Sequence, residues 1–254
     1  MIPSPPAIDH VVLLVRDLER ATTAMEMAGY EILQRADRAE KPGSSFRFVS
    51  FPDGSYILLN AFSDEAAKKH RLGPILDERE GWGDWSVVVG DLDAAIHRAR
   101  AAGIVLGPEN KVANTLSTGE PWGLRLLQSG RGSGGDPSLP FLVQDVEGRS
   151  ARIPGPTRQP SGATAISGLR IASDTPLESA GRLAVLVGLE APTLPELRIG
   201  TTTVAFVATD PSASGTARLG GPVGITVTGT AGATHLGAWP FPAMALDNSM
   251  EPQQ

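Results

Sequence analysis

Hydrophobic and polar positions recur along the chain in one order: a strand-like apolar run, followed by a stretch with helical spacing. The run "IDHVVLLV" leads into "RDLERATTAMEMAGY", where Leu18, Ala21, Met25 and Ala28 would form one buried stripe. The same order returns in "VGDLDAAIHRARAAGI" and, less regularly, in "ASDTPLESAGRLAVLVGL". The pattern indicates three copies of one repeated unit.

Each of the three predicted helices has a start and a stop signal. A carboxylate at the start of a helix accepts hydrogen bonds from free backbone amides, and a glycine after the end adopts the left-handed conformation without strain. The predicted N-caps are Asp17, Asp91 and Asp174. The predicted C-terminal glycines are Gly29, Gly103 and Gly188.

Strand-like segments follow each helix and are separated by turn signals. They read "SSFRFVSF" and "GSYILLNAF" in the first copy, and "PWGLRLLQS" and "LPFLVQDV" in the second. In the third copy, "TTTVAFVATD" and "GGPVGITVTG" are the matching strands. The sequence therefore predicts an α+β fold of tandem β-α-β-β-β modules.

The segments between the copies predict the domain organisation. "SDEAAKKHRLGPILDEREG" is typical of a linker helix that begins at Ser63 or Asp64 and ends by Gly81. "RIPGPTRQPSGAT" is rich in proline and glycine, which is typical of a domain boundary. We expect paired modules over 1–153 (1–62 and 82–153) and a third, divergent module over 160–248.

Composition and charge narrow the class of partner. The chain has 254 residues, a formal charge of −6 and no cysteine. No Lys/Arg cluster of the kind that neutralises phosphates is present, which disfavours nucleic acid and anionic membranes as partners. The absence of cysteine excludes disulfides and thiolate chemistry. With no signal-peptide pattern and no run of 18 apolar residues, the expected location is the cytoplasm and the expected partner is a small molecule.

The repeated unit, with "DHVVLLVRDLE" and "FPDGSYILL" in the first copy, resembles the glyoxalase-like branch of the vicinal oxygen chelate (glyoxalase/bleomycin resistance/dioxygenase) superfamily. "GWGDWSVVV", "LPFLVQDV" and "QPSGATAIS" extend the resemblance into the later copies. It implies that two modules pair into a cup-shaped sheet that holds a divalent metal. It does not single out one reaction, because related folds carry different functions.

The resemblance also implies which positions would hold that metal. In this sequence they are His10 and Leu58 in the first copy, and Asp84 and Gln144 in the second. Leucine cannot coordinate a cation, so the site is incomplete. Two alternatives stay open: His10, Asp84 and Gln144 bind a divalent metal with water in the remaining places, or the protein has no metal cofactor.

Each candidate residue has a structural alternative. His10 is either a base or ligand in the cup, or a histidine on the sheet face that is bonded to Asp9 or Tyr56. Asp84, which lies between two tryptophans, is either catalytic or caps backbone amides in a loop. Gln144 and Asp145 are neighbours on one strand, so at most one of them faces the cup.

The remaining candidates would bind the ligand. Arg47 and Arg125 occupy matching places in "SFRFVSF" and "GLRLLQS" and would clamp an oxyanion if they pointed inward. Trp85 and Tyr56 would stack on a planar ligand, and alternation places Leu58 and Asn60 on the same face as Tyr56.

Two functions of different class follow from these residues. One is a lyase- or isomerase-type enzyme, or a dioxygenase-like one, that acts on a small oxygenated or aromatic metabolite and uses His10 with Asp84. The other is a metal-free binding or sequestration protein of the bleomycin-resistance type. An odd third module leaves a sheet edge or face uncovered, which favours a homodimer in which the third modules meet.

Overall fold

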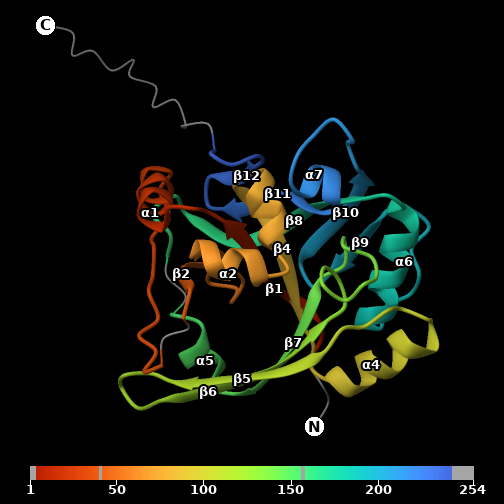
Figure 1. The fold of residues 1–254 in the computed structure, drawn as a ribbon, viewed down its shortest axis with the longest axis horizontal. Coiled ribbons are helices and arrows are strands. Elements are labelled where there is room, and N and C mark those ends of the chain that lie inside the picture. The colour runs from red at the N-terminus through yellow and green to blue at the C-terminus, as the bar shows by residue number, and fades with distance from the viewer. Residues whose placement is uncertain (1–3, 40–41, 156–157, 242–254) are drawn as a thin grey trace, which may run out of the picture.

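The computed structural model describes residues 4–39, 42–155 and 158–241 and contains two mixed β-sheets. The first sheet has seven strands in the order β2-β3-β1-β4-β7-β6-β5, and the second has five in the order β12-β11-β8-β10-β9. Figure 1 shows the seven-stranded sheet curving through the molecule, with α1 and α4 at opposite ends of it. The predicted α+β class of fold is confirmed.

Two repeated units build the seven-stranded sheet. The first consists of β1 (Ala7–Leu14), α1 (Leu18–Met27), β2 (Ser44–Ser50) and β3 (Tyr56–Phe62). The second consists of β4 (Gly81–Val88), α4 (Leu92–Ala101), β5 (Glu109–Thr115), β6 (Pro121–Gln128) and β7 (Phe141–Glu147). In both units the first strand runs parallel to the last, and the units join where β1 pairs antiparallel with β4. The second strand expected in the first unit is reduced to a single bridge between Leu33 and Phe48.

The predicted N-caps are found in the first two units but not in the third, whereas the predicted C-terminal glycines are found in all three. The Asp17 side chain accepts a hydrogen bond from the backbone amide of Arg20 at 2.9 Å, and the Asp91 side chain accepts one from the backbone amide of Ala94 at 2.8 Å. Before α6 (Pro176–Val187), the N-cap is Thr175 and not Asp174, because Pro176 sets the first helical position. The three predicted glycines all have positive φ, at Gly29, Gly103 and Gly188.

The five-stranded sheet contains the third unit and corrects one expectation. Its elements are β8 (Ala163–Ser173), α6, β9 (Glu196–Ile199), β10 (Thr202–Ala208), β11 (Gly221–Gly229) and β12 (Gly232–Leu236). β10 runs parallel to β8, as β3 does to β1. β11, expected as the next strand of the same unit, instead pairs antiparallel on the other side of β8, as β4 pairs with β1. It therefore corresponds to the first strand of a further, truncated unit.

Short helices make the connections. The expected linker helix is broken into α2 (Asp64–Lys69) and α3 (Gly73–Glu78), with His70 in an extended conformation between them. A Cβ atom at Gly73 would lie 2.2 Å from the Ala67 carbonyl oxygen, so only glycine allows this tight turn. Two further short helices are α5 (Arg149–Arg152), directly after β7, and α7 (Thr216–Leu219), before β11.

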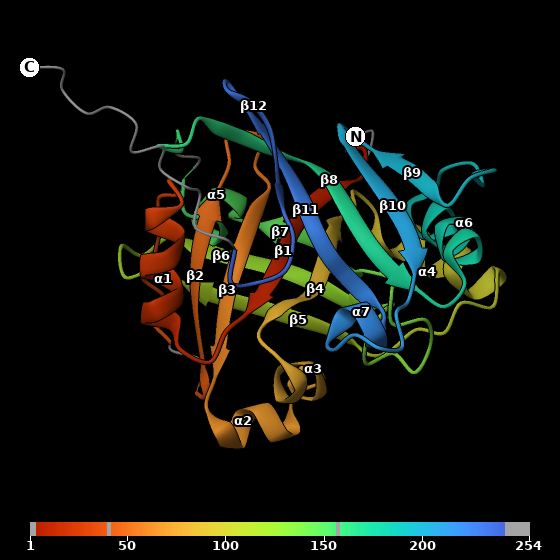
Figure 2. The same ribbon diagram turned by 90° about the horizontal axis from the view of Figure 1, so that it is seen from above.

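The two faces of the seven-stranded sheet have different surroundings. The convex face buries the main apolar core against α1, α4 and the third unit, and in Figure 2 the five-stranded sheet lies over this side of β1 and β4. The concave face carries smaller clusters, around Phe48 and Tyr56 in one unit and around Leu124 and Phe141 in the other. This concave face is the predicted cup.

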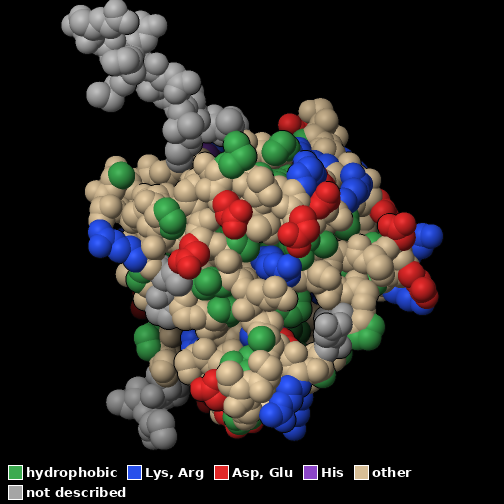
Figure 3. Space-filling view, turned by 90° about the vertical axis from the view of Figure 1, so that its left-hand side faces the viewer, with side chains coloured by type: hydrophobic (Ala, Val, Ile, Leu, Met, Phe, Trp, Pro, Cys, Tyr) green, Lys and Arg blue, Asp and Glu red, His purple; other side chains and the backbone are tan. Residues whose placement is uncertain are grey.

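The division into modules over 1–153 and 160–248 stays a prediction, and its residues 1–3, 40–41 and 242–248 lie outside the described part of the chain. Within that part, no helix has the length and apolarity needed to span a bilayer. On the face drawn in Figure 3, acidic and basic side chains are interspersed, and no large basic patch gathers there.

Candidate functional site

A bulge at the start of β1 brings two neighbouring polar residues together. Ile8 pairs with Val87 and His10 pairs with Ser86, so Asp9 has no partner in the register and strict alternation is interrupted. The Asp9 and His10 side chains therefore meet, with 2.8 Å between Nδ1 of His10 and Oδ2 of Asp9. Because a carboxylate only accepts hydrogen bonds, Nδ1 is the donor in this bond, and the tautomer with its proton on Nδ1 has its lone pair on Nε2.

The His10 ring lies where the two units meet on the concave face. It stacks on Tyr56 of β3, with ring centroids 4.6 Å apart, and meets Phe141 of β7 edge-on at 5.3 Å. The residue is 5 % exposed. Among the described residues, Nε2 has no hydrogen-bond partner, so this nitrogen is chemically free within the cup.

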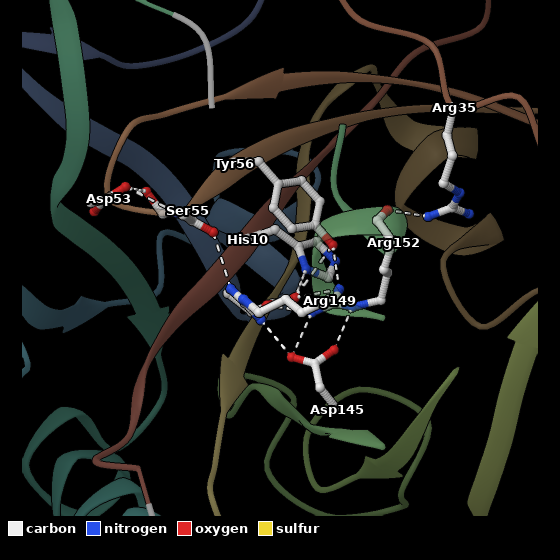
Figure 4. Close-up of polar contacts among 10 residues, drawn as sticks. His10, Arg35, Asp53, Ser55, Tyr56, Asp145, Arg149 and Arg152 are labelled. Atoms are coloured by element: carbon white, nitrogen blue, oxygen red, sulfur yellow. Dashed lines mark hydrogen bonds and ion pairs between the residues drawn. The ribbon is translucent and has the colours of Figure 1, made fainter. Parts of the chain in front are cut away.

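Two arginines from α5, Arg149 and Arg152, bind Asp9, and Figure 4 shows both of them near His10, Tyr56 and Asp145. Arg152 places Nη2 at 2.8 Å from Oδ1 of Asp9, and Arg149 places Nη1 at 2.8 Å from the same oxygen. Both guanidinium groups also bind Asp145 at the end of β7, each at 2.7 Å. Asp9 is fully buried and Arg152 is 2 % exposed, so these charges neutralise each other inside the protein.

The network fixes the protonation of its members. Burial alone would raise the pKa of Asp9, but the charge of Arg152 and hydrogen bonds from His10 and Arg152 hold it well below its usual value. Burial, together with the negative charge of Asp9, raises the pKa of Tyr56 far above its usual value. Tyr56 is therefore a neutral hydroxyl, which donates to Asp9 over 3.3 Å and accepts from Arg152 over 3.0 Å.

The second half of the cup has a different polar centre, formed by Asp84 and Ser86 on β4. Asp84 is 2 % exposed and forms an ion pair with Arg71, which lies between α2 and α3. Oδ2 of Asp84 lies in this ion pair and has no hydrogen bond in the part of the chain that the structure describes. Oγ of Ser86 is also buried and has no hydrogen-bond partner in the described part of the chain. Arg71 additionally lies 5.3 Å from the ring centre of Phe141.

Several predicted residues do lie on the concave face with His10. Tyr56 is opposite His10 in the parallel pairing of β1 and β3, and Leu58 is opposite Val12. Asn60 follows at the same spacing, is half-buried, and accepts a hydrogen bond from Ser44 at 3.1 Å. This wall combines an aromatic ring, an aliphatic side chain and an amide.

The predicted arginine clamp does not point inward. Arg47 binds Glu19 of α1 at 3.2 Å, and Arg125 binds Asp93 of α4 at 2.7 Å, so both guanidinium groups lie on the helix side of the sheet. Arg125 is held further by Glu109. The matching places of the two arginines reflect equivalent strand-to-helix ion pairs in the two units, and not a shared ligand.

Two more candidates lie outside the cup. Gln144 donates to the Gly90 carbonyl at 3.0 Å and accepts from the Leu92 amide at 3.3 Å, so it caps the start of α4. Alternation then turns its neighbour Asp145 into the cup. Trp85 is fully buried in the core behind the sheet, where its indole N–H donates to the Ser138 carbonyl at 3.0 Å.

The residues present do not fit the metal that the resemblance implies. Leu58 supplies no ligand atom, Gln144 is on the other face, and the charge of Asp84 is already neutralised by its ion pair with Arg71. Within the described residues there is no group of three or more His, Cys, Asp or Glu side chains that could hold a metal ion. The guanidinium groups of Arg149 and Arg152 bind Asp9, the residue that holds His10.

Two cavities lie away from the cup. One, of about 320 Å³, lies between the second unit and the start of α6 and is lined by Asp136, Thr175 and Arg182, among others. The other, of about 500 Å³, is an open groove beside the start of α1 that includes Arg16 and Arg47. Neither is lined by His10 or Asp84, so size alone does not identify the chemical site.

Asp9 was named from the sequence as a possible partner of His10, and the structure shows that bond. The other partners of the candidates, which are Ser86, Arg71, Arg149 and Arg152, were not selected. One signal was available: Asp145 and Arg149 are four residues apart across the end of a strand, next to the position where a cup residue was expected. The bulge that turns Asp9 inward has no signal of its own in the sequence.

Comparison with known proteins supports the architecture. A family profile described as a glyoxalase-like domain matches residues 8–187. A search of curated proteins finds no match. Among solved structures, a hypothetical protein from Staphylococcus aureus is similar over 80% of this chain and 86% of that chain, with a TM-score of 0.58 and 12% identity.

Methylmalonyl-CoA epimerases are also among the similar structures. The Streptomyces coelicolor enzyme, in complex with 2-nitronate-propionyl-CoA, matches 57% of this chain and 100% of its own, with 21% identity and a TM-score of 0.40. The Mycobacterium tuberculosis enzyme matches 54% of this chain and 85% of its own, with 21% identity and a TM-score of 0.38.

Proposed function

Since this chain belongs to the glyoxalase-like domain family, we propose that it is a lyase- or isomerase-type enzyme that moves a proton on a small oxygenated or aromatic metabolite without a metal ion. The observation that carries the proposal is the Asp9–His10 pair, which leaves Nε2 free on the concave face. A metal acts in such reactions by stabilising negative charge, whereas an oriented imidazole acts by taking and returning the proton itself.

Each member of the network has a role in that proton transfer. Asp9 holds the Nδ1–H, which orients the ring and stabilises the imidazolium formed when Nε2 accepts a proton. Arg152 and Arg149 keep Asp9 ionised, and Tyr56 stacks on the ring and limits its rotation. Phe141 supports the opposite side, so the imidazole is held before a ligand arrives.

A proton-exchange assay tests this proposal without knowledge of the natural substrate. Metal-free protein is incubated in D₂O with a panel of small hydroxycarbonyl compounds, and loss of the acidic C–H signal is followed by NMR. We expect His10→Gln to lower the rate by roughly 10²–10⁴-fold, the range typical of a general base. The matched control is His97→Ala, an exposed histidine on α4, which should keep the wild-type rate. Equal rates in wild type and His10→Gln would contradict the proposal.

A second function is supported by the burial of the same network. His10, Asp9 and Arg152 are almost inaccessible, which suits a protein that only encloses a small molecule. In that case His10→Gln would change ligand affinity by only a few-fold and no proton exchange would be catalysed. The two functions are separated by measuring affinity and exchange on the same variant.

A further inference from the structure

We infer that His10, Ser86 and Asp84 form one binding site for a small neutral molecule that presents at least two hydroxyl groups. The inference deepens the proposed function, on which it rests, by naming the chemistry of the ligand. It is carried by polar atoms that have no hydrogen bond among the described residues and that gather on one stretch of β1 and β4.

The pairing of β1 with β4 brings these three residues together. His10 is directly opposite Ser86, and Asp84 precedes Ser86 by two residues on the same face of β4. Side chains directly opposite each other in an antiparallel pair have Cβ atoms about 4.5–5.5 Å apart, and the next residue on the same face is about 7 Å away. One molecule of a few carbon atoms can therefore contact all three.

The burial of these groups makes their lack of hydrogen bonds informative. Ser86 is 0 % exposed and Asp84 is 2 % exposed, yet Oγ of the serine and Oδ2 of the aspartate have no hydrogen-bond partner among the described residues. A buried polar atom without a partner costs about 1–3 kcal/mol, and most such atoms in proteins are satisfied. By contrast, Ser129, which is equally buried, donates to the Pro140 carbonyl at 2.7 Å.

These polar atoms select for hydrogen-bond donors on the ligand. Nε2 of His10 and Oδ2 of Asp84 are acceptors, and Oγ of Ser86 can accept or donate. A carboxylate offers no proton to these acceptors, and the guanidinium groups of Arg71 and Arg149 that would attract it are already paired with Asp84 and Asp9. A cation would be repelled by the same two guanidinium groups. A neutral polyol or hydroxyketone supplies donors without either conflict.

Arg71 marks the route into this site. Its side chain is 17% exposed, whereas that of Asp84 is 3% exposed, so the arginine is the solvent-side member of their ion pair. It also contacts the Arg131 carbonyl at 3.2 Å and the Phe141 ring. The segment that carries it is the short extended connection between α2 and α3, which is not held in a regular element.

The test combines ligand binding with stability. The probes are glycerol and dihydroxyacetone, with lactate as a carboxylate of similar size, and binding is read from the Nε2 signal of His10 by ¹H–¹⁵N NMR on metal-free protein. We expect both hydroxylated probes to shift that signal and lactate to leave it unchanged. Ser86→Ala should weaken binding of both hydroxylated probes by roughly tenfold, because one hydrogen bond to the ligand is lost.

Ser86→Ala should also raise the midpoint of urea unfolding, because it removes a buried hydroxyl that has no partner in the described structure. The matched control, Ser129→Ala, should lower that midpoint, since it leaves the Pro140 carbonyl without its donor, and should not change binding. If Ser86 had a purely structural role, Ser86→Ala would lower the midpoint of urea unfolding, and that result would overturn the inference.

The remaining outcomes separate this inference from the proposed function. If lactate binds through His10 and the hydroxylated probes do not, the ligand chemistry inferred here is wrong while a metal-free His10 site stands. If no probe shifts His10 although Ser86→Ala stabilises the protein, the buried polar groups hold only water and the inference fails. Absence of both binding and His10-dependent proton exchange overturns both proposals.

Discussion

Each half of the cup contains one buried carboxylate, and the two carboxylates differ in how they are bound. In the first half, Asp9 is bound by His10, Tyr56 and two arginines, so its hydrogen-bonding capacity is used completely. In the second half, Asp84 forms an ion pair with one arginine, and its Oδ2 has no hydrogen bond within the described residues. The first arrangement is suited to holding a group in place, and the second is suited to accepting hydrogen bonds from a ligand.

This difference arises from the segment that follows each unit. After β7 the chain turns at once into α5, which places Arg149 and Arg152 in contact with Asp9. After β3 the chain continues through α2 and reaches Asp84 with Arg71 alone. The two units therefore have the same strand pairing, but the segments that follow them place different numbers of arginines beside the two buried aspartates.

The largest effect is expected from Arg152→Met. The substitution preserves volume but leaves Asp9 and Asp145 without their shared buried cation. Breaking a buried ion pair from one side typically costs about 3–5 kcal/mol. We expect a loss of this size in the free energy of unfolding, measured by urea denaturation. Arg125→Met, whose carboxylate partners are at the surface, is the matched control and should lose far less. Equal losses would show that the network around Asp9 has no special importance.

Acid should produce a smaller loss in the wild-type protein. The pKa of Asp9 is lowered in the folded state, so its contribution to stability is complete above the ordinary carboxyl pKa of about 3.9 and is lost as the pH falls through the folded value. Stability measured between pH 6 and pH 3 should therefore fall. Protonation removes the charge on Asp9, so this loss should stay below that of Arg152→Met. In Asp9→Asn, the free energy of unfolding should depend less steeply on pH. An unchanged pH dependence would show that other carboxylates cause the acid sensitivity.

The smallest effect on stability is expected from Arg71→Met. Arg71 is partly exposed, so water can replace part of its charge beside the buried Asp84, and we expect a loss below that of about 3–5 kcal/mol expected at Arg152. Urea denaturation of the two variants in parallel gives the comparison. If Arg71→Met lowered the free energy of unfolding as much as Arg152→Met does, the ion pairs in the two halves of the cup would contribute equally to stability.

The sequence was sufficient for the repeated architecture because that information is local. Apolar spacing located α1 and α4, and Asp17 and Asp91 marked where they begin. The place of β11 was not predictable from its alternation, because a strand on either side of β8 has the same alternating pattern. A pattern within one segment indicates a strand but not its neighbour.

The site was only partly predictable for the same reason. His10, Tyr56 and Leu58 were expected on one face and lie there, since they follow regular alternation. Arg47 and Arg125 were ambiguous because their direction depends on acidic residues of α1 and α4. The choice between Gln144 and Asp145 was decided by a helix cap at one residue and by α5 at the other, and both are tertiary contacts.

The central claim is that His10 acts without a metal, and the most direct test is the metal dependence of its chemistry. The rate of proton exchange is measured on protein stripped with a chelator and then titrated with Mg²⁺, Mn²⁺, Ni²⁺ or Zn²⁺. The account predicts full His10-dependent activity in the stripped protein and no increase on titration. Activity that is absent after stripping and returns with one equivalent of a divalent ion would contradict it.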